Sequence, residues 1–375
     1  MTDAQRTLRD QAREASLREI APQAADVDRQ LRFPREAVLS LAKLGMMGVA
    51  IPRAWGGLGL DTVACTLMLE EVASGCASTA AVVSVQNLLL CEPILRFGTE
   101  AQKRAWLPAL ASGTKLGCFA LTETNGGSSL NGVTTQARRD GDGFVLNGSK
   151  SFVTCAPVAD LVVVFAVTSA DAKNGLSAFL VPAGSAGITL GPAHAKLGLR
   201  GAVSSSLTLS DTWIPADALL GGEGAGREVL SFALDGGRIG AAAVSVGIAR
   251  AAFNAATRYA IERCSSGEPI SQHQSIQFML ADMSTHIDAA RLLTWRAAAA
   301  RDAGAPVSAH TSMAKLVGSE VASRVASDAV QVLGGNGCLM DFAVERHFRD
   351  AKVTEIYEGT SEIQRLGIAS ALLKE

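Results

Sequence analysis

The feature that most constrains the fold is a long apolar segment at residues 227–264. Its sequence, REVLSFALDGGRIGAAAVSVGIARAAFNAATRYAIERC, predicts a single helix longer than about 30 residues, in spite of its glycines. Three further helical patterns follow at residues 271–304, 308–335 and 361–373. Long amphipathic helices are stable when they pack against one another, so we expect these segments to form a four-helix bundle.

The first third of the chain is also helical in pattern. The segment PREAVLSLAKLGMMG (34–48) repeats apolar residues at helical spacing, and residues 78–98 are almost wholly apolar, which predicts a central helix. Thr99 is a predicted N-cap and Gly113 a predicted helix stop. Because 375 residues are many for one core, we expect separate domains, with residues 1–116 as an N-terminal helical domain.

The middle of the chain has the pattern of a small all-β domain over residues 117–225. The sequence Asp-Gly-Asp-Gly at 140–143 predicts a tight hairpin turn between two of its strands. The short β-type runs are GCFALTE, TTQARR, FVLNGSKSFVT, DLVVVFAV, LSAFLVP, GITLG and SSSLTLSD. The pattern returns to helices over residues 226–375, so the fold class is α+β, in the order helical, β, helical.

Composition narrows the function. Hydrophobic content of 48% and charged content of 19% fit a soluble protein with a large core, and a net charge of −2 gives no reason to expect nucleic acid. The seven cysteines are scattered and include no C-x-x-C, and the five histidines have no metal-ligand spacing, so we expect neither disulfides nor a metal. We see no signal core and no apolar segment long enough to span a bilayer, so we expect a cytoplasmic protein without membrane contact.

The candidate catalytic group is a carboxylate in the segment AKVTEIYEGTSEIQR (351–365). Glu358 lies between Tyr357 and Gly359, and Thr360 and Ser361 are suited to capping the helix that follows. A carboxylate just before a helix N-terminus is held rigidly while its side chain can face a cavity. On this short motif alone, a solvated loop carboxylate is the better interpretation.

Together with GGNG at 334–337 and CFALTE at 118–123, this segment resembles the acyl-CoA dehydrogenase family, and in detail its short-chain (butyryl-type) members. The resemblance runs nearly from end to end. It implies an N-terminal helical domain, a β-barrel-like middle domain and a C-terminal four-helix bundle. It also implies that FAD takes a hydride from carbon β of a short-chain acyl thioester while Glu358 removes the α-proton, giving the trans-2-enoyl product. The implied partners are acyl-CoA, an electron-transfer flavoprotein and further copies of the chain in a homotetramer, a dimer of dimers.

The resemblance also assigns residues around the acyl thioester. The backbone N–H of Glu358 and a flavin ribityl hydroxyl hold the thioester oxygen, and Tyr357 and Gly359 flank the ligand. Some family members have their base at the position of Gly237, so Glu358 is the obvious base here. Arg238 matches an arginine that supports the active site, with a salt bridge to a loop carboxylate as the alternative. Asp235 resembles a residue that contacts the coenzyme A arm, with a solvated helix aspartate as the alternative.

The flavin contacts that the resemblance implies form three groups. The first group meets the isoalloxazine ring or the pyrophosphate within one chain and comprises Leu121, Thr122, Gly127, Ser128, Phe152 and Thr154. Ser128 also approaches the ligand. The second group reaches the FAD of a neighbouring subunit and comprises Arg263, Gln331, Gly334 and Gly335. The last contacts are Thr360 and Glu362. Most of these residues also have ordinary structural interpretations, such as a turn, a core aromatic or a helix C-cap.

The chain departs from the family pattern near the cofactor. Residues 123–129 read ETNGGSS, without the usual proline and final acidic residue, which predicts a looser loop. Phe152 replaces a tryptophan, and residues 264–267 lack a phenylalanine. These changes favour, as an alternative substrate, an acyl group carried by an acyl-carrier protein. A flavin-dependent oxidase or monooxygenase and a flavin-free binding protein are alternatives of other classes, although the first generally lacks a glutamate at position 358. The usual nicotinamide-binding fold is excluded because no strand–GxGxxG–helix unit is present.

Overall fold

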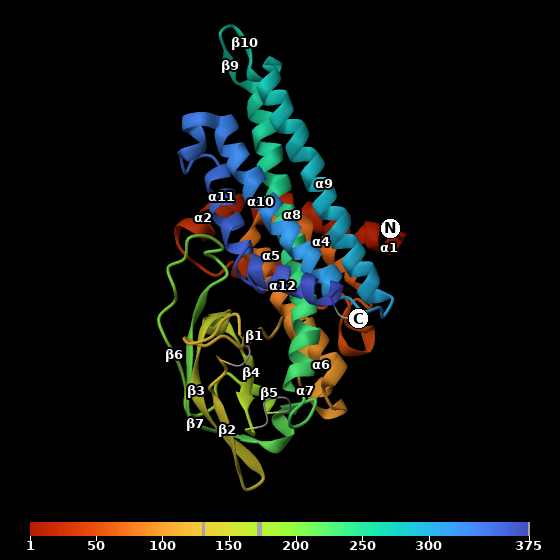
Figure 1. The fold of residues 1–375 in the computed structure, drawn as a ribbon, viewed down its shortest axis with the longest axis vertical. Helices are drawn as coiled ribbons and strands as arrows, with labels where there is room; N and C mark the ends of the chain where they lie inside the picture. The colour runs from red at the N-terminus through yellow and green to blue at the C-terminus, as the bar shows by residue number, and fades with distance from the viewer. Residues whose placement is uncertain (130–131, 171–174, 374–375) are drawn as a thin grey trace.

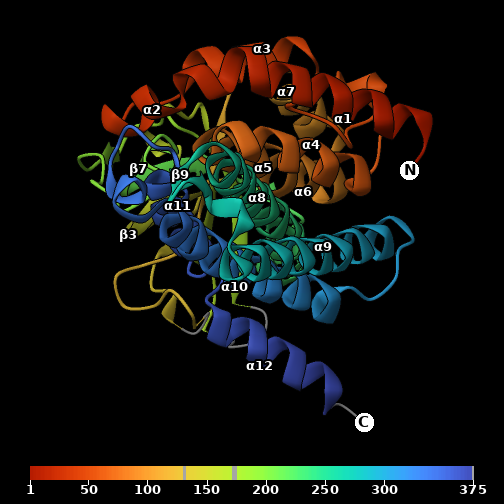
Figure 2. The same cartoon turned by 90° about the horizontal axis from the view of Figure 1, so that it is seen from above.

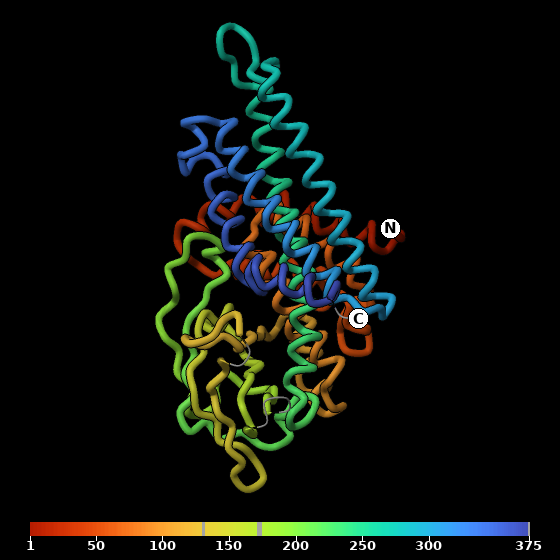
Figure 3. The backbone as a smooth tube through the Cα atoms, viewed as in Figure 1, coloured from red at the N-terminus to blue at the C-terminus, as the bar shows by residue number. Residues whose placement is uncertain are grey.

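The computed structural model describes residues 1–129, 132–170 and 175–373. Helices occupy both ends of the chain, and a β domain lies between them in the sequence. In space the β domain forms one end of the elongated molecule (Figure 1). This is the predicted α+β order. The long helix α8 (Gly226–Glu262) extends along the molecule from the β domain to the far end of the bundle (Figures 1 and 3).

The N-terminal block is a set of short helices around an apolar centre. The central predicted helix is α5 together with the π-helical turn and α6 that continue it, and nearly all of its residues are buried. Thr99 caps α7 as predicted, and Gly113 follows that helix with a left-handed φ of 70°. The helices are α1 (Asp3–Ala15), α2 (Ala21–Arg29), α3 (Arg35–Lys43), α4 (Thr62–Gly75), α5 (Ala77–Ser84), α6 (Glu92–Phe97) and α7 (Glu100–Ala111), with π-helical turns at Ser16–Ile20 and Val85–Cys91.

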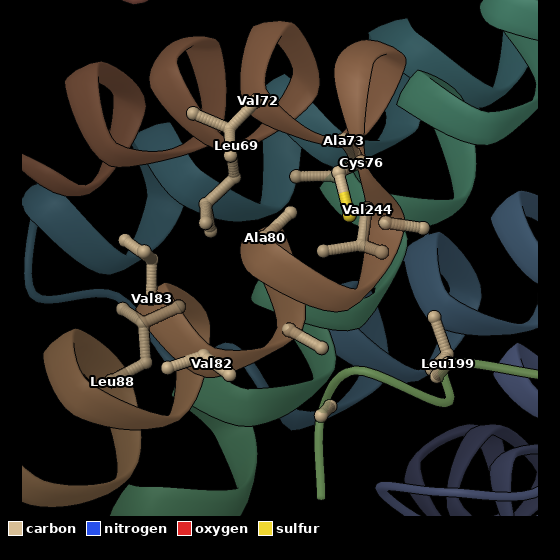
Figure 4. Packing of buried hydrophobic residues seen from close by; sticks show 14 of the residues in the cluster. Leu69, Val72, Ala73, Cys76, Ala80, Val82, Val83, Leu88, Leu199 and Val244 are labelled. Carbon is tan, nitrogen blue, oxygen red and sulfur yellow. The ribbon is translucent and has the colours of Figure 1, made fainter. Parts of the chain in front are cut away.

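Two helical stretches have the length and hydropathy of a membrane span, which corrects the expectation that the chain contains none. They are Ala77–Phe97 and Gly226–Glu262. Their most apolar windows are 94% and 78% buried inside the protein, so both are explained as core helices. Figure 4 shows part of this core, where α4, α5 and α8 pack together.

The β domain is one mixed sheet with the strand order β6-β7-β3-β2-β4-β5-β8, and β1 pairs in parallel with β4. The predicted hairpin is present, with Asp140 opposite Gly143 and Gly141 at a φ of 59°. Within the described residues the end strands β6 and β8 do not pair, so the barrel-like domain is an open sheet in its hydrogen bonding. Its strands are β1 (Gly117–Ala120), β2 (Gln136–Asp140), β3 (Gly143–Thr154), β4 (Leu161–Val167), β5 (Leu176–Pro182), β6 (Ile188–Leu190), β7 (Ser204–Pro215) and β8 (Leu219–Leu220).

The C-terminal block is built around α8, which is one continuous helix as predicted. Its glycines sit where other helices come close, because a Cβ on Gly240 would lie 2.1 Å from Ser84 Oγ and one on Gly247 would lie 2.5 Å from Ala73 Cβ. The other helices are α9 (Gln274–Asp302), α10 (Ser308–Leu333), α11 (Val344–Thr354) and α12 (Ser361–Leu372), and a small hairpin of β9 (Cys264–Ser265) and β10 (Glu268–Pro269) joins α8 to α9. Viewed from above, α12 extends outward from the bundle (Figure 2).

Candidate active site

The loop between α11 and α12 holds Glu358 in an unusual backbone conformation. Its φ is 56°, in the left-handed region that residues other than glycine seldom adopt. Gln364 fixes the loop, because its buried Nε2 donates to the carbonyl oxygens of Glu358 at 3.0 Å and Gly359 at 2.9 Å. Thr360 caps α12 as predicted, accepting from Ile363 N at 3.4 Å. A strained residue held in place by its surroundings is typical of a functional position.

The carboxylate of Glu358 lies against α8 at Gly237. A Cβ on Gly237 would be 2.3 Å from Glu358 Oε2 and 2.9 Å from Leu89 Cδ2. The missing side chain of Gly237 therefore makes the space that the carboxylate occupies, with Leu89 beside it. The two positions that sequence analysis compared as sites for a base are thus in contact.

The surroundings of Glu358 favour its protonated form. Burial raises the pKa of Glu358 to about 7, while the nearby cations of Arg238 and Lys315 oppose this rise. Burial also raises the pKa of the Tyr357 phenol, which stays neutral. A carboxylate with a pKa near 7 is suited to accept a proton at neutral pH. Glu358 is not the solvated loop carboxylate of the alternative interpretation.

Asp235 is buried and its carboxylate is already hydrogen-bonded within the protein. It accepts from Ser308 Oγ and Thr311 Oγ1 of α10, both at 3.0 Å, and lies 3.4 Å from Arg238 Nη1. The alternative of a solvated helix aspartate is therefore wrong. Among the residues that the structure describes, Arg238 forms an ion pair with this helix residue and with no loop carboxylate, so its alternative is wrong in that detail. The contacts of both residues with a ligand stay predictions.

Several of the residues assigned to the flavin lie together around the end of β3, a region that we call the flavin face. Ser151 N donates to Thr122 O at 2.7 Å, which places the segment of Leu121 and Thr122 beside the end of β3. Thr122 Cγ2 is 3.6 Å from the position that a Cβ on Gly127 would take. At the end of β3, Phe152 has a left-handed φ of 56° and is 69% exposed.

These residues fit a flavin. An exposed aromatic ring on a strained backbone offers a stacking surface, and the half-buried Thr154 offers a hydroxyl two residues further along the strand. Gly127 and Ser128 are exposed, so backbone amides there can approach an anion closely. FAD bound at this face would stack on Phe152 and receive hydrogen bonds from the neighbouring backbone.

The residue that fixes this face, Glu123, was not predicted from the sequence. Glu123 is buried and accepts from Lys150 Nζ at 2.7 Å, from Thr134 N at 2.7 Å and from Thr135 N at 3.0 Å. Burial acts to raise the pKa of Glu123, but the hydrogen bonds from Lys150 and the two threonines outweigh it and lower the pKa to about 2. Both ends of the segment 123–135 are thereby joined, so the missing proline does not leave it unanchored. The paired threonines at 134–135 are the only sequence signal of this lock.

One connection links the flavin face to the base. The ring of His194 lies 5.4 Å from that of Phe152. Further along the same segment, Leu199 N donates to Asp350 Oδ1 of α11 at 2.6 Å, and burial raises the pKa of Asp350 to about 6. Because α11 leads directly to Glu358, this segment ties the sheet to the catalytic loop.

The residues assigned to a neighbouring subunit's FAD lie away from this face. Arg263, Gln331, Gly334 and Gly335 are exposed and belong to the ends of α8 and α10, at the end of the bundle opposite the β domain (Figure 1). Asn336 Nδ2 donates to Tyr259 Oη at 2.9 Å, which joins these two helix ends. Glu362, the last of the assigned flavin contacts along the sequence, is exposed in the first turn of α12. Their cofactor contacts stay predictions.

Models of three domains match the chain in sequence: the acyl-CoA dehydrogenase N-terminal domain over residues 2–114, the middle domain over 118–212 and the C-terminal domain over 224–373. A curated relative, the mitochondrial short-chain specific acyl-CoA dehydrogenase of Bos taurus, is 46% identical over 375 residues, covering 100% of this chain and 91% of the relative.

Solved structures are similar over the whole chain. Butyryl-CoA dehydrogenase from Megasphaera elsdenii has a TM-score of 0.98 at 39% identity, covering 100% of this chain and 99% of that one. A chain in a structure described as electron transferring flavoprotein of Acidaminococcus fermentans gives the same values. The prolyl acyl carrier protein oxidase AnaB has a TM-score of 0.96 at 29% identity, with complete coverage of both chains.

Proposed function

We propose that this chain, which belongs to the acyl-CoA dehydrogenase family, is an FAD-dependent enzyme that converts a short-chain acyl-CoA into its trans-2-enoyl thioester. The observation that supports this most is the Glu358 carboxylate, held against Gly237 with its pKa raised to about 7. Removing a proton beside a thioester carbonyl at neutral pH needs a base of this kind.

Each step of the proposed dehydrogenation is assigned to particular residues of this chain. Glu358 takes the α-proton, and the electrons of that C–H bond form the new double bond as hydride leaves carbon β. FAD supplies the acceptor for that hydride, as no side chain can. The backbone N–H of Glu358 polarises the thioester oxygen, and Leu89 and Tyr357 keep the site apolar so that the carboxylate stays a strong base.

The cofactor site extends beyond one chain in this proposal. Phe152, Thr154 and the 121–128 segment hold the flavin end. From a second copy, Arg263 reaches the pyrophosphate and Gln331 holds the adenosine end. Large apolar side chains exposed on the bundle support assembly, among them Phe278, Leu292 and Leu366, each more than 60% exposed. We propose a homotetramer, a dimer of dimers, located in the cytoplasm and passing electrons to an electron-transfer flavoprotein.

A second candidate substrate is an acyl group on an acyl-carrier protein. The similarity to AnaB supports it, as does the 123–129 loop, which lacks an acidic residue after Ser128 and leaves Gly127 and Ser128 exposed. Matched butyryl thioesters of coenzyme A and of an acyl-carrier protein distinguish the two. A coenzyme A preference of tenfold or more in kcat/KM supports the leading proposal, and the reverse preference supports the carrier protein.

Glu358→Gln tests the assignment of the base. The variant keeps its flavin and its fold but loses substrate-dependent flavin reduction, because an amide cannot take the α-proton. Glu320→Gln is the matched control, an exposed glutamate of α10 that pairs with Arg365 of α12 and is assigned to no cofactor or substrate contact. Reduction by Glu358→Gln at the unmodified rate would remove Glu358 from the mechanism.

A further inference from the structure

Lys315 is a fully buried cation that the proposed reaction has not used. It lies on α10 with a relative exposure of 0%, and its Nζ has no hydrogen-bond partner among the residues that the structure describes. Burying an ammonium group costs several kcal/mol unless an opposite charge compensates it. A buried lysine without a direct partner therefore requires an explanation from the charges around it.

Four charged groups act on the charge of Lys315. They are Glu358 in the catalytic loop, Glu355 at the end of α11, Arg238 on α8 and Glu362 on α12. Burial lowers the pKa of Lys315 to about 8, and the Glu358 carboxylate is the strongest influence in the opposite direction. Glu355 already accepts from Lys352 Nζ at 2.5 Å, and Glu362 is exposed. Glu358 is therefore the acidic group left to balance Lys315.

Further buried polar atoms of α10, the catalytic loop and α12 have no hydrogen-bond partner among the described residues. A Cβ on Gly367 would be 3.0 Å from Ser312 Oγ, so α10 and α12 are in contact one turn before Lys315. Within the described part of the chain, these atoms include Ser312 Oγ, Lys315 Nζ, Tyr357 Oη, Ser361 Oγ and Gln364 Oε1. Buried groups of this kind normally bind ordered water, and a bridging water can join two charges that do not touch.

We propose that Lys315 is a positioning residue for the reaction, whose buried ammonium is the counter-charge that keeps the Glu358 carboxylate ionised and oriented before the α-proton is taken. This inference rests on the proposed role of Glu358 as the base. Lys315 does not touch the substrate. It acts through Glu358 from the side of α10, while Arg238 acts from the side of α8.

The charges of Glu358 and Lys315 explain at which stage of the reaction Lys315 is needed. Before the reaction the Glu358 anion and the Lys315 cation balance each other inside the protein. When the α-proton moves from the substrate carbon to a Glu358 oxygen, the carboxyl becomes neutral and Lys315 keeps its charge. Lys315 therefore stabilises the state that is ready to react and holds the pKa of Glu358 below the value that burial alone would give.

The test replaces Lys315 in the flavin-loaded enzyme and follows the titration of Glu358. Lys315→Met removes the charge with little change in volume, Lys315→Gln is a second neutral variant that can still bind water, and Lys315→Arg keeps the charge. Lys352→Met is the control, since Lys352 is a nearby lysine that pairs with Glu355 but is exposed. The infrared carboxyl band that Glu358→Gln abolishes gives the midpoint directly, and anaerobic flavin reduction gives the same midpoint from rates.

We expect both neutral variants to raise the Glu358 midpoint by about one pH unit or more. Their reduction rates would fall about tenfold at one pH unit below the unmodified midpoint and return to near normal at high pH. Lys315→Arg and Lys352→Met would stay near the unmodified midpoint. An unchanged midpoint, or a loss of rate that is equal at every pH, would overturn the inference. If Glu358→Gln retains activity, the proposed base fails, yet the infrared midpoint still reports on Lys315.

Discussion

Gly237→Ala introduces one methyl group at the point where Glu358 rests on α8. The new Cβ would lie 2.3 Å from Glu358 Oε2, whereas ordinary contact begins near 3.4 Å. The carboxylate must therefore move by about 1 Å, because Leu89 Cδ2 at 2.9 Å blocks the other side of the methyl group. A displacement of about 1 Å in a reacting group can lower kcat about 100-fold.

The fold should tolerate this substitution. Alanine in a helix interior is favoured over glycine by up to about 1 kcal/mol, which offsets part of the local strain. We therefore expect a large loss of anaerobic flavin reduction with butyryl-CoA and a Tm close to that of the unmodified protein. Gly318→Ala is the control, because the atoms nearest to its Cβ belong to Ala242 and lie at 3.3 Å or more. A Gly237→Ala enzyme with more than half the normal rate would refute the claim that Glu358 occupies this space.

Three further predictions concern pH and the flavin face. With the pKa of Glu358 raised to about 7, kcat/KM for butyryl-CoA should fall as the pH drops through about 7, and a profile that stays flat down to pH 5 would contradict this. Because the pKa of Glu123 is lowered to about 2, its stabilisation is present above the unfolded value near 4.5 and is lost as the pH falls toward 2. Glu123→Gln should therefore cost about 2–3 kcal/mol in denaturant unfolding at pH 7 and much less at pH 3; an equal cost at both pH values would exclude the lock. Phe152 is 69% exposed, so Phe152→Ala should change unfolding by less than about 0.5 kcal/mol while reducing the flavin retained per chain after gel filtration, and full retention would show that the ring does not stack on the flavin.

Much of the fold was predictable because its signals are local. The length of α8, the hairpin at 140–143 and the Thr99 and Thr360 caps each depend on residues close together in sequence. The expectation that no segment has the character of a membrane span was wrong, because helices at the centre of a large core become as apolar as spanning ones.

The parts of the site that sequence analysis missed depend on long-range contacts. Glu123 and Lys150 are 27 residues apart, and the local sequence around each of them does not indicate that the two form a buried ion pair. Lys315 reads as an ordinary helical lysine until α8, α11 and α12 are placed around it. The burial of Asp235 likewise depends on two hydroxyls of α10, more than 70 residues away. Glu358 was identified only because the family resemblance gave its short motif a context.

The central claim is tested most directly by adding butyryl-CoA anaerobically to the purified protein while recording its visible spectrum. We predict an oxidised-flavin spectrum that bleaches rapidly on addition, in the unmodified protein and in Glu320→Gln but not in Glu358→Gln. A bound flavin that stays oxidised with butyryl-CoA would contradict the assignment of a short-chain acyl-CoA as the substrate. A purified protein without flavin would contradict the proposal that the protein is an FAD-dependent enzyme.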